Sequence, residues 1–282
     1  MGANQQQSEA WNVPEAVNDV QQADRYERQL APIAVALIDS LSLTARHRVV
    51  DVGCGCGATT IAVARRCASA FGIDTSRPLI DVAIARARAA SIDNAQFVVD
   101  DAQTYVFAKS AVDLVISQFG LMYFDDPVVA FTNLRRTLVT GGRMAFTCWQ
   151  GIENNEWIQI VARAVAEYVT VPALGGRSRG AGMFSLQSPE ETNELLRVSG
   201  FADIDVAAMS PSVVIGGGGT LDESIEFLTG SSIARGLLGL LSPNERSLAV
   251  SAIGRSLTDR FESGVGVSLG TGVWLVSATN PH

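Results

Sequence analysis

One segment near the start of the chain constrains the fold more than any other. A short apolar run, Arg48 to Val52, leads directly into three glycines at alternate positions, Gly53, Gly55 and Gly57. This pattern predicts a buried strand that enters a tight turn, and residues 59–66 read as the helix that follows. A strand, a glycine turn and a helix in this order favour an α/β fold with a ligand at the carboxyl end of the strand.

The same alternation continues through the first half of the chain and predicts a parallel sheet with helices on both faces. Further strands are expected at residues 70–73, 95–99, 112–117 and 143–149, with helices at residues 77–90 and 127–138. One or two helices, the second opened by Pro32, are expected before the first strand. The second half predicts strands at 204–207, 213–215 and 272–278, helices at 156–169, 189–198, 221–241 and 243–262, and a flexible link at 216–219.

Composition excludes several classes of function. The 282 residues carry 21 basic and 29 acidic side chains, a net charge of −8, which argues against a nucleic-acid partner. Lys109 is the single lysine, so Schiff-base chemistry is disfavoured. The four cysteines form no Cys-x-x-Cys pair, so we expect no disulfide framework, no metal site and a cytoplasmic location. The chain has no signal-peptide pattern at its start and no apolar run long enough to span a bilayer, so stable membrane insertion is not expected.

The glycine turn fits two kinds of ligand. Gly53-x-Gly55-x-x-Ala58, with Asp74 about 20 residues further on, matches a dinucleotide fingerprint. The alternative gives weight to Asp51, whose carboxylate lies at the end of the strand. S-adenosylmethionine offers an amino group for Asp51, a carboxylate for the start of the next helix and a ribose diol for Asp74. The turn by itself leaves both alternatives open.

Five motifs in order resemble the class I S-adenosylmethionine-dependent methyltransferases. They are Val49 to Gly57, Gly72-Ile-Asp74, Asp100-Asp101-Ala102, Asp113 to Ser117, and Leu134 to Phe146. Within that superfamily the chain is most similar to the small-molecule branch that includes the ubiquinone and menaquinone C-methyltransferases. The resemblance covers about residues 45–150.

The resemblance implies a set of cofactor-binding residues. The residues expected at the methionine end are Asp51, Gly53, Cys54, Gly55 and Gly57. Asp74 and Thr75 are expected at the ribose, and Asp101 and Ala102 at the adenine, with Asp100 as the alternative to Asp101. The floor under the sulfonium is expected to consist of Ser117, Gln118 and Phe119. The acceptor pocket is expected to include Tyr26, Phe119, Met122, Trp149 and Phe184, and Trp11, Asn12 and Arg25 are further candidates for contacts from the lid.

The resemblance also implies the architecture. We expect a Rossmann-like sheet of seven strands, mostly parallel with an antiparallel last strand. Residues 1–44 are expected to form a helical lid, residues 45–150 the S-adenosylmethionine-binding core, and residues 151–282 substrate-side helices and the rest of the sheet. A homodimer is compatible with the edge strands and apolar helices of the second half.

The expected function is methyl transfer from S-adenosylmethionine to carbon, oxygen or nitrogen of a small, largely apolar or aromatic acceptor. His47 precedes the first strand, at the sheet edge opposite the ligand, and the other histidine, His282, is terminal, so we expect no imidazole base. In-line displacement then depends mainly on positioning. Two alternatives remain: a cofactor-binding protein with pericyclic, decarboxylating or purely binding function, and a nicotinamide oxidoreductase.

Overall fold

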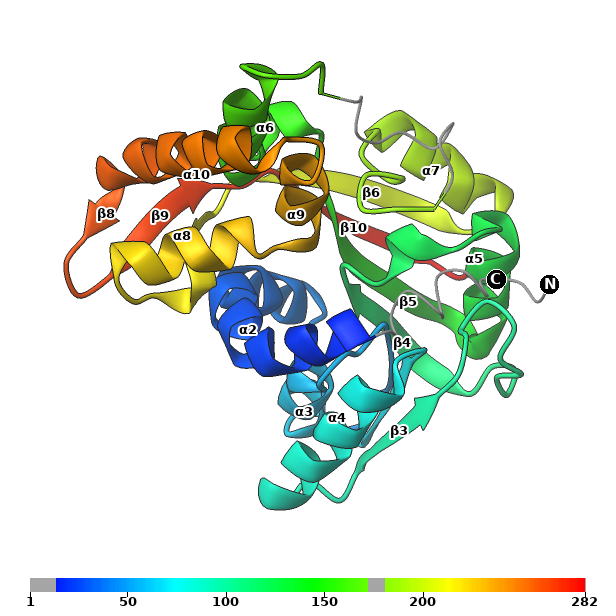
Figure 1. Cartoon of the computed structure of the whole chain (residues 1–282). Coiled ribbons are helices and arrows are strands. Elements are labelled where there is room, and N and C mark those ends of the chain that lie inside the picture. Colours follow the sequence, from blue (N-terminus) through cyan, green and yellow to red (C-terminus); the bar gives the residue numbers. More distant parts are fainter. Residues whose placement is uncertain (1–13, 172–180, 282) are drawn as a thin grey trace.

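A seven-stranded sheet forms the centre of the molecule (Figure 1). The computed structural model describes residues 14–171 and 181–281. The strand order is β3-β2-β1-β4-β5-β10-β6, and in this sheet β10 alone runs opposite to the other six strands. The strands are β1 (Arg48–Val52), β2 (Ser69–Asp74), β3 (Ala95–Val99), β4 (Val112–Gln118), β5 (Leu138–Trp149), β6 (Ala202–Met209) and β10 (Val273–Thr279). The Rossmann-like sheet with an antiparallel last strand is therefore confirmed.

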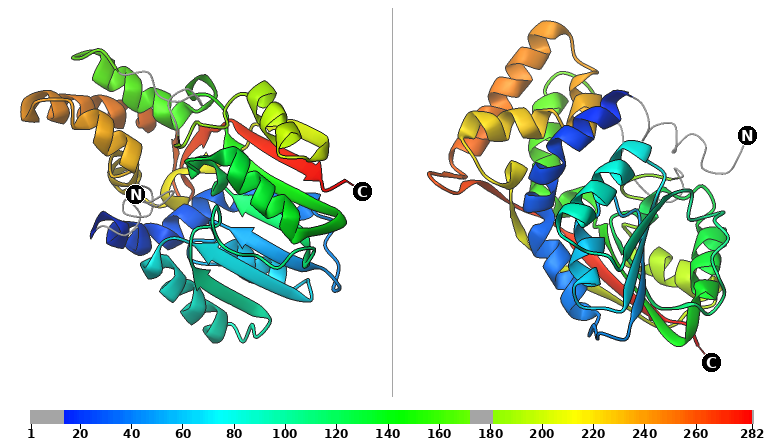
Figure 2. Two further views of the ribbon diagram at one scale, coloured as in Figure 1. Left: turned by 90° about the vertical axis from the view of Figure 1, so that its right-hand side faces the viewer. Right: turned by 90° about the horizontal axis from the view of Figure 1, so that it is seen from below.

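Helices cover both faces of this sheet, because successive strand residues are buried on opposite sides. On one face, Val49 of β1 and Leu114 of β4 belong to the same buried cluster as Val63 of α3. On the other face, Val50 and Phe131 belong to a second cluster. Figure 2 shows the two layers of helices with the sheet between them. The helices are α3 (Ala58–Ala64) and α4 (Arg77–Ala89) on the first face, and α5 (Pro127–Thr137) and α7 (Pro189–Val198) on the second.

The N-terminal segment is one long helix, α2 (Pro14–Ser40), and Pro32 lies inside it. The expectation of a second helix opened by Pro32 is wrong. A proline in a helix interior costs about 3 kcal/mol, so tertiary contacts must compensate. They do so on both sides of Pro32: Leu37 and Leu41 pack in the core of the sheet, while Arg25 and Gln29 bond to residues 216–223.

The second half of the chain adds a group of helices and a small sheet that we call the cap. It comprises α6 (Glu156–Ala166), α8 (Leu221–Thr229), α9 (Ser232–Leu238), α10 (Pro243–Thr258), and β7 (Ser212–Val214), β8 (Phe261–Glu262) and β9 (Gly266–Gly270), with the short helices η1 (Leu121–Tyr123), η2 (Ile152–Asn154) and η4 (Ile215–Gly217) nearby. In Figure 1 the cap helices lie beyond α2, away from α5 and α7.

Three sequence-based expectations in the cap are wrong. The helix expected at 221–241 is broken at Gly230, because the Ser231 side chain accepts a hydrogen bond from Ala234 N–H and starts α9. The helix expected to reach Glu262 ends at Thr258, and β8 and β9 follow it as a hairpin. Of the glycines expected as a flexible link, Gly216 and Gly217 belong to η4, which packs against α2.

Candidate functional site

The glycine turn after β1 is tight on one side and open on the other. The backbone N–H groups of Gly53 and Cys54 both donate to the Ile73 carbonyl, at 2.8 and 3.2 Å. Gly53 has φ +67°, and a Cβ there would lie 2.7 Å from Cα of Gly120. Gly55 has φ +52°, yet a Cβ there would meet nothing within 4 Å. The open side of the turn therefore leaves room for a ligand to approach the backbone.

Asp51 is a buried carboxyl group beside this turn. Its side chain accepts a hydrogen bond of 2.6 Å from the Thr60 hydroxyl. Burial raises the pKa of Asp51 to about 7, the Thr60 hydrogen bond opposes this shift, and the charge of Asp74 adds to it. A cationic ligand group placed beside Asp51 would favour the ionised form and lower this pKa.

Asp74 ends β2 and holds two segments of backbone. Its Oδ2 accepts from Gly55 N–H and its Oδ1 from Ser76 N–H, both at 2.9 Å. Burial raises the pKa of Asp74, and these N–H groups, together with that of Thr75, act in the opposite direction. Each carboxylate oxygen has more than one lone pair, so Asp74 retains capacity to accept from the hydroxyl groups of a ligand.

The acidic pair after β3 is arranged asymmetrically. Asp100 is exposed and its Oδ1 accepts the Asp101 N–H at 2.8 Å. Asp101 is partly buried, and its Oδ1 accepts from Gln103 N–H at 2.9 Å. Ala102 is buried, and its carbonyl accepts from the Asn133 side chain at 3.0 Å. Asp101 and Ala102 thus lie on the inner side of this turn, while Asp100 faces solvent.

Ser117 and Gln118, at the end of β4, use their side chains within the protein. The Ser117 hydroxyl donates to the Val52 carbonyl at 2.7 Å and accepts from Gly120 N–H at 3.0 Å, which joins the ends of β1 and β4. Gln118 accepts from the Thr59 hydroxyl at 3.1 Å and donates to the Leu30 carbonyl at 3.2 Å. The role of both residues under the cofactor stays a prediction.

Aromatic side chains at the ends of β4 and β5 form a cluster, which we call the aromatic group. Phe119 has φ +63°, a conformation that is strained for a non-glycine residue. Its ring stacks on Trp149 with centroids 4.1 Å apart and planes 14° apart. Trp149 in turn contacts Trp157 of α6 at 5.7 Å. Phe119 is only partly buried, so the group presents an aromatic surface next to the glycine turn.

The other expected acceptor residues lie in two separate places. Met122 and Phe184 are almost fully buried, and the Met122 carbonyl accepts from the Ser185 hydroxyl at 2.6 Å. Tyr26 of α2 packs on Phe227 of α8, with ring centroids 4.6 Å apart. Trp11 and Asn12 lie outside the described residues. Gly120 is a residue that sequence reasoning missed; it approaches Gly53 closely because β1 and β4 are neighbours in the sheet, which no local pattern reveals.

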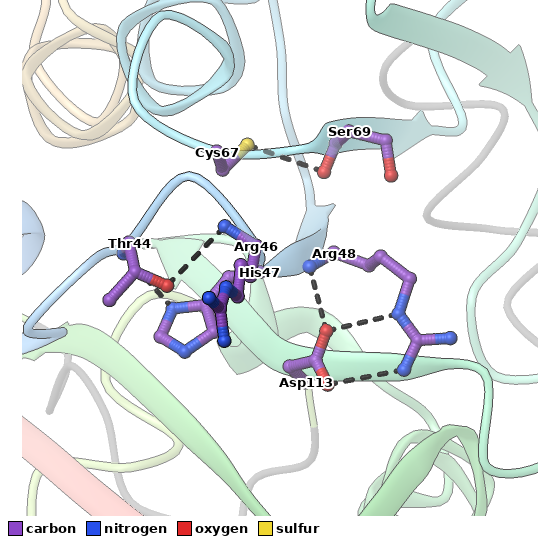
Figure 3. Close-up of polar contacts among 7 residues, drawn as sticks. All are labelled: Thr44, Arg46, His47, Arg48, Cys67, Ser69 and Asp113. Carbon is purple, nitrogen blue, oxygen red and sulfur yellow. Dashed lines mark hydrogen bonds and ion pairs between the residues drawn. The ribbon is translucent and has the colours of Figure 1, made fainter.

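The cysteines and the one described histidine do not suggest a reactive centre. Burial raises the pKa of Cys56 to about 11 and that of Cys54 well above its usual range, so these thiols stay protonated. In the part of the chain that the structure describes, no group of three His, Cys, Asp or Glu side chains is placed to hold a metal ion. His47 lies just before β1, where its Nδ1 accepts from Thr44 N–H at 3.3 Å beside the ion pair of Arg48 and Asp113 (Figure 3). It therefore lies at the end of the strand opposite the glycine turn.

The site and fold together define a class of protein. Asp51 near the end of β1, Asp74 at the end of β2, the acidic turn after β3 and the glycine turn lie along the carboxyl edge of a seven-stranded sheet with one antiparallel strand, as the resemblance to class I methyltransferases implies. Residues 49–142 match the protein family described as "Methyltransferase domain". This match agrees with the resemblance to class I, S-adenosylmethionine-dependent methyltransferases that the sequence motifs indicated.

Similarity to known proteins agrees with this assignment. The chain is 32% identical over 119 residues to aklanonic acid methyltransferase DauC of Streptomyces sp. (strain C5), which is 41% of this chain and 54% of that protein. It is 24% identical to a demethylmenaquinone methyltransferase of Clavibacter sepedonicus, over 64% of this chain and 76% of that protein. The solved structure of YcgJ from Bacillus subtilis shares the fold, with a TM-score of 0.59 at 17% identity over 88% of this chain and 98% of that one. The chain spans 33% to 54% of the length of the first curated relatives that it matches.

Proposed function

We propose that this protein is an S-adenosylmethionine-dependent methyltransferase that acts on a small, largely apolar or aromatic acceptor. The observation that carries the proposal is the order of acidic groups along the sheet edge. Asp51, Asp74 and Asp101 lie at the carboxyl ends of β1, β2 and β3, which are neighbours in the sheet. A ligand lying along this edge would meet an acceptor for an ammonium group, then one for a diol, then one for an exocyclic amine.

Each part of S-adenosylmethionine is assigned to its own residues. Asp51 accepts from the ammonium group, and the backbone of Gly53, Cys54, Gly55 and Gly57 packs against the methionine part. Asp74 and Thr75 receive the ribose hydroxyls, and Asp101 with Ala102 receives the adenine edge. Ser117 and Gln118 hold the floor under the sulfonium. When bound, S-adenosylmethionine supplies an electrophilic methyl group. A nicotinamide ligand would explain neither Asp51 nor Asp101.

The acceptor is assigned to the aromatic group at the ends of β4 and β5. The partly exposed ring of Phe119, backed by Trp149, offers an apolar surface beside the turn. Met122, Phe184 and Tyr26 remain candidates further from it. With His47 at the opposite edge, rate acceleration rests on holding the nucleophile roughly 3 to 3.5 Å from the methyl carbon.

Partners and compartment belong to the same proposal. The net charge of −8 disfavours a nucleic-acid substrate. No helix in the described part of the chain is long and apolar enough to cross a membrane. The four cysteines, all unpaired and buried, suit a reducing cytoplasm. A homodimer stays a prediction.

Calorimetric titration with S-adenosylhomocysteine tests the proposal. We expect Asp74→Ala to weaken binding strongly, whereas Asp113→Asn, at the opposite sheet edge, should bind like the unchanged protein. Incubation with S-adenosylmethionine and a panel of phenols, quinols and enols, followed by mass spectrometry, should reveal a methylated product. Failure of the unchanged protein to bind S-adenosylmethionine or S-adenosylhomocysteine would contradict the proposal. Binding without a methylated product would favour the alternative of non-methylating chemistry.

A further inference from the structure

One arginine outside the expected site contacts both the glycine turn and α2. Arg86 lies in the last turn of α4. Its Nη1 donates to the Cys56 carbonyl at 3.2 Å and to the Glu27 carboxylate at 2.5 Å, and its Nη2 pairs with Asp24. The Arg86 side chain is 27% exposed, so these bonds are partly shielded from water. A single guanidinium thus joins three points on two different segments.

The contact to Cys56 completes the support of the turn. From the sheet side, the turn is held by the Ile73 carbonyl and the Asp74 carboxylate. From the helix side, Gly57 leaves space for α4, because a Cβ there would lie 2.9 Å from Cβ of Ala83. Arg86 is one helical turn beyond Ala83 and bonds to the carbonyl next to Gly57. The turn is therefore fixed between β2 and α4.

The contact to α2 connects the turn with the cap. Arg25, next to Asp24, donates to the Glu223 carbonyl at 3.0 Å and to the Gly216 carbonyl at 3.4 Å. It also lies over the Phe227 ring, 4.7 Å from the centroid. In Figure 1, α2 runs between the cap helices and α4, as these contacts require. One short stretch of α2 thus faces α4 through its acids and the cap through Arg25.

We propose that Arg86 is a positioning residue for the cofactor site. It holds the glycine turn and the Asp24–Glu27 segment of α2 in one fixed arrangement. This inference rests on the proposed function. Arg86 itself touches no reacting atom. It fixes the Cys56 carbonyl, so that the N–H groups and the open side of the turn are set before a ligand arrives. It also keeps α2, and with it the cap, against the turn.

The test compares Arg86→Met with two matched variants. Arg88→Met removes an exposed arginine of the same helical turn. Arg48→Met removes the ion pair with Asp113 at the opposite sheet edge and so controls for a general loss of stability. Each variant is titrated with S-adenosylhomocysteine and melted, and amide hydrogen exchange is followed at residues 53–57 and 22–30. Arg86→Lys tests whether charge without the planar fork is enough.

We expect Arg86→Met to bind S-adenosylhomocysteine about tenfold more weakly and to exchange faster in both segments. Arg86→Lys should recover only part of the affinity, and Arg88→Met and Arg48→Met should keep all of it. If the activity assay succeeds, KM for S-adenosylmethionine should rise with kcat retained. Because Glu27 is left without its partner in Arg86→Met, the double variant with Glu27→Gln should restore stability but not affinity.

Two results are decisive against the inference. If Arg86→Met melts lower yet binds within twofold of the unchanged protein, Arg86 supports only stability. If Arg48→Met loses as much affinity, the effect is a general one. Failure of the unchanged protein to bind S-adenosylhomocysteine would instead remove the proposed function, and the inference with it.

Discussion

Two residues of the site are held in states that cost free energy. Asp51 is buried with a pKa of about 7, and Phe119, which is not glycine, has a positive φ. Such costs persist where the surrounding structure imposes them, and they concentrate at functional sites. Ligand binding can offset each of these costs, so single substitutions at these residues test the site.

The raised pKa of Asp51 predicts a pH-dependent affinity. Only the ionised carboxyl pairs with an ammonium group, so S-adenosylhomocysteine should bind about tenfold more weakly at pH 6 than at pH 8. Titration calorimetry at several pH values measures this. Asp51→Asn should bind weakly with a flat profile, whereas Asp113→Asn should keep the slope. An unchanged slope in Asp51→Asn would assign the titration to another group.

The same shift has a consequence for stability in the absence of ligand. The native state keeps the Asp51 proton to higher pH than the unfolded chain does. This contribution of Asp51 is present below the unfolded pKa and is lost as pH rises through the folded pKa. The part of the unfolding free energy that comes from Asp51 should thus fall between about pH 4 and pH 7, which urea denaturation of Asp51→Asn and the unchanged protein can separate.

Two glycines of the turn should respond differently to the same substitution. Gly53→Ala would place a Cβ 2.7 Å from a backbone atom of Gly120, so we expect it to cost several kcal/mol or to prevent folding. Gly55→Ala meets nothing within 4 Å and should cost only about 1 to 2 kcal/mol for its positive φ. Its Cβ would enter the proposed ligand space, so affinity should fall by more than stability does. Urea denaturation and titration calorimetry measure the two effects, and full affinity in Gly55→Ala would place the ligand elsewhere.

At the scale of elements, α2 belongs to two parts of the molecule. Its C-terminal half packs in the sheet core through Leu37 and Leu41, and its N-terminal half is seated on η4 and α8. Gly216 and Gly217 of η4 form the seat of α2, and both are glycine because α2 lies very close to them. A Cβ on Gly216 would lie 2.6 Å from Nη2 of Arg25, and one on Gly217 would lie 2.4 Å from Cβ of Arg28.

Gly217→Ala should therefore loosen the N-terminal half of α2. We expect faster hydrogen exchange at residues 22–30 and a severalfold weaker affinity for S-adenosylhomocysteine, because the helix can no longer lie on η4. Gly264→Ala is the matched control: its φ of +84° carries the same backbone cost, but a Cβ there meets nothing within 4 Å. If both variants behave alike, backbone strain and not the seat explains the effect.

At the scale of the whole molecule, the hydrophobic core extends across the domain boundaries expected from the sequence. One buried cluster contains Val50 of β1 and Phe131 of α5 together with Trp157 of α6, Phe227 of α8 and Ile253 of α10. A core that runs through all these elements favours unfolding as one cooperative unit. The division into residues 1–44, 45–150 and 151–282 thus describes roles along the chain and stays a proposal.

The fragment 45–150 should consequently fail to fold alone. It would lose α2, and it would leave β5 without β10, which pairs with it from Arg143 to Trp149 in the full chain. An exposed edge of this length favours aggregation. We expect no near-ultraviolet circular dichroism and no cooperative melting, in contrast to the full chain. A cooperative transition in the fragment would instead support an independent domain.

The sequence by itself determined the α/β sheet, and it predicted the outline of the cofactor site. These features are local: a strand, a glycine turn and an acid at a fixed spacing have the same meaning wherever the chain carries them. Asp51, Gly53 and Asp74 could be singled out for that reason, because the carboxyl ends of parallel strands meet at one edge of a sheet.

The tertiary structure alone decided the features that depend on distant residues. Gly120 faces Gly53 because β1 and β4 are neighbours, α2 continues through Pro32 because both its halves are packed, and Arg86 reaches Cys56 and Glu27 because three segments meet. The proposed acceptor pocket is of the same kind, since Phe119 lies after β4, Trp149 ends β5 and Trp157 belongs to α6. Long-range packing has no signature in a single sequence, because any apolar side chain satisfies the local pattern while the fold selects its neighbours.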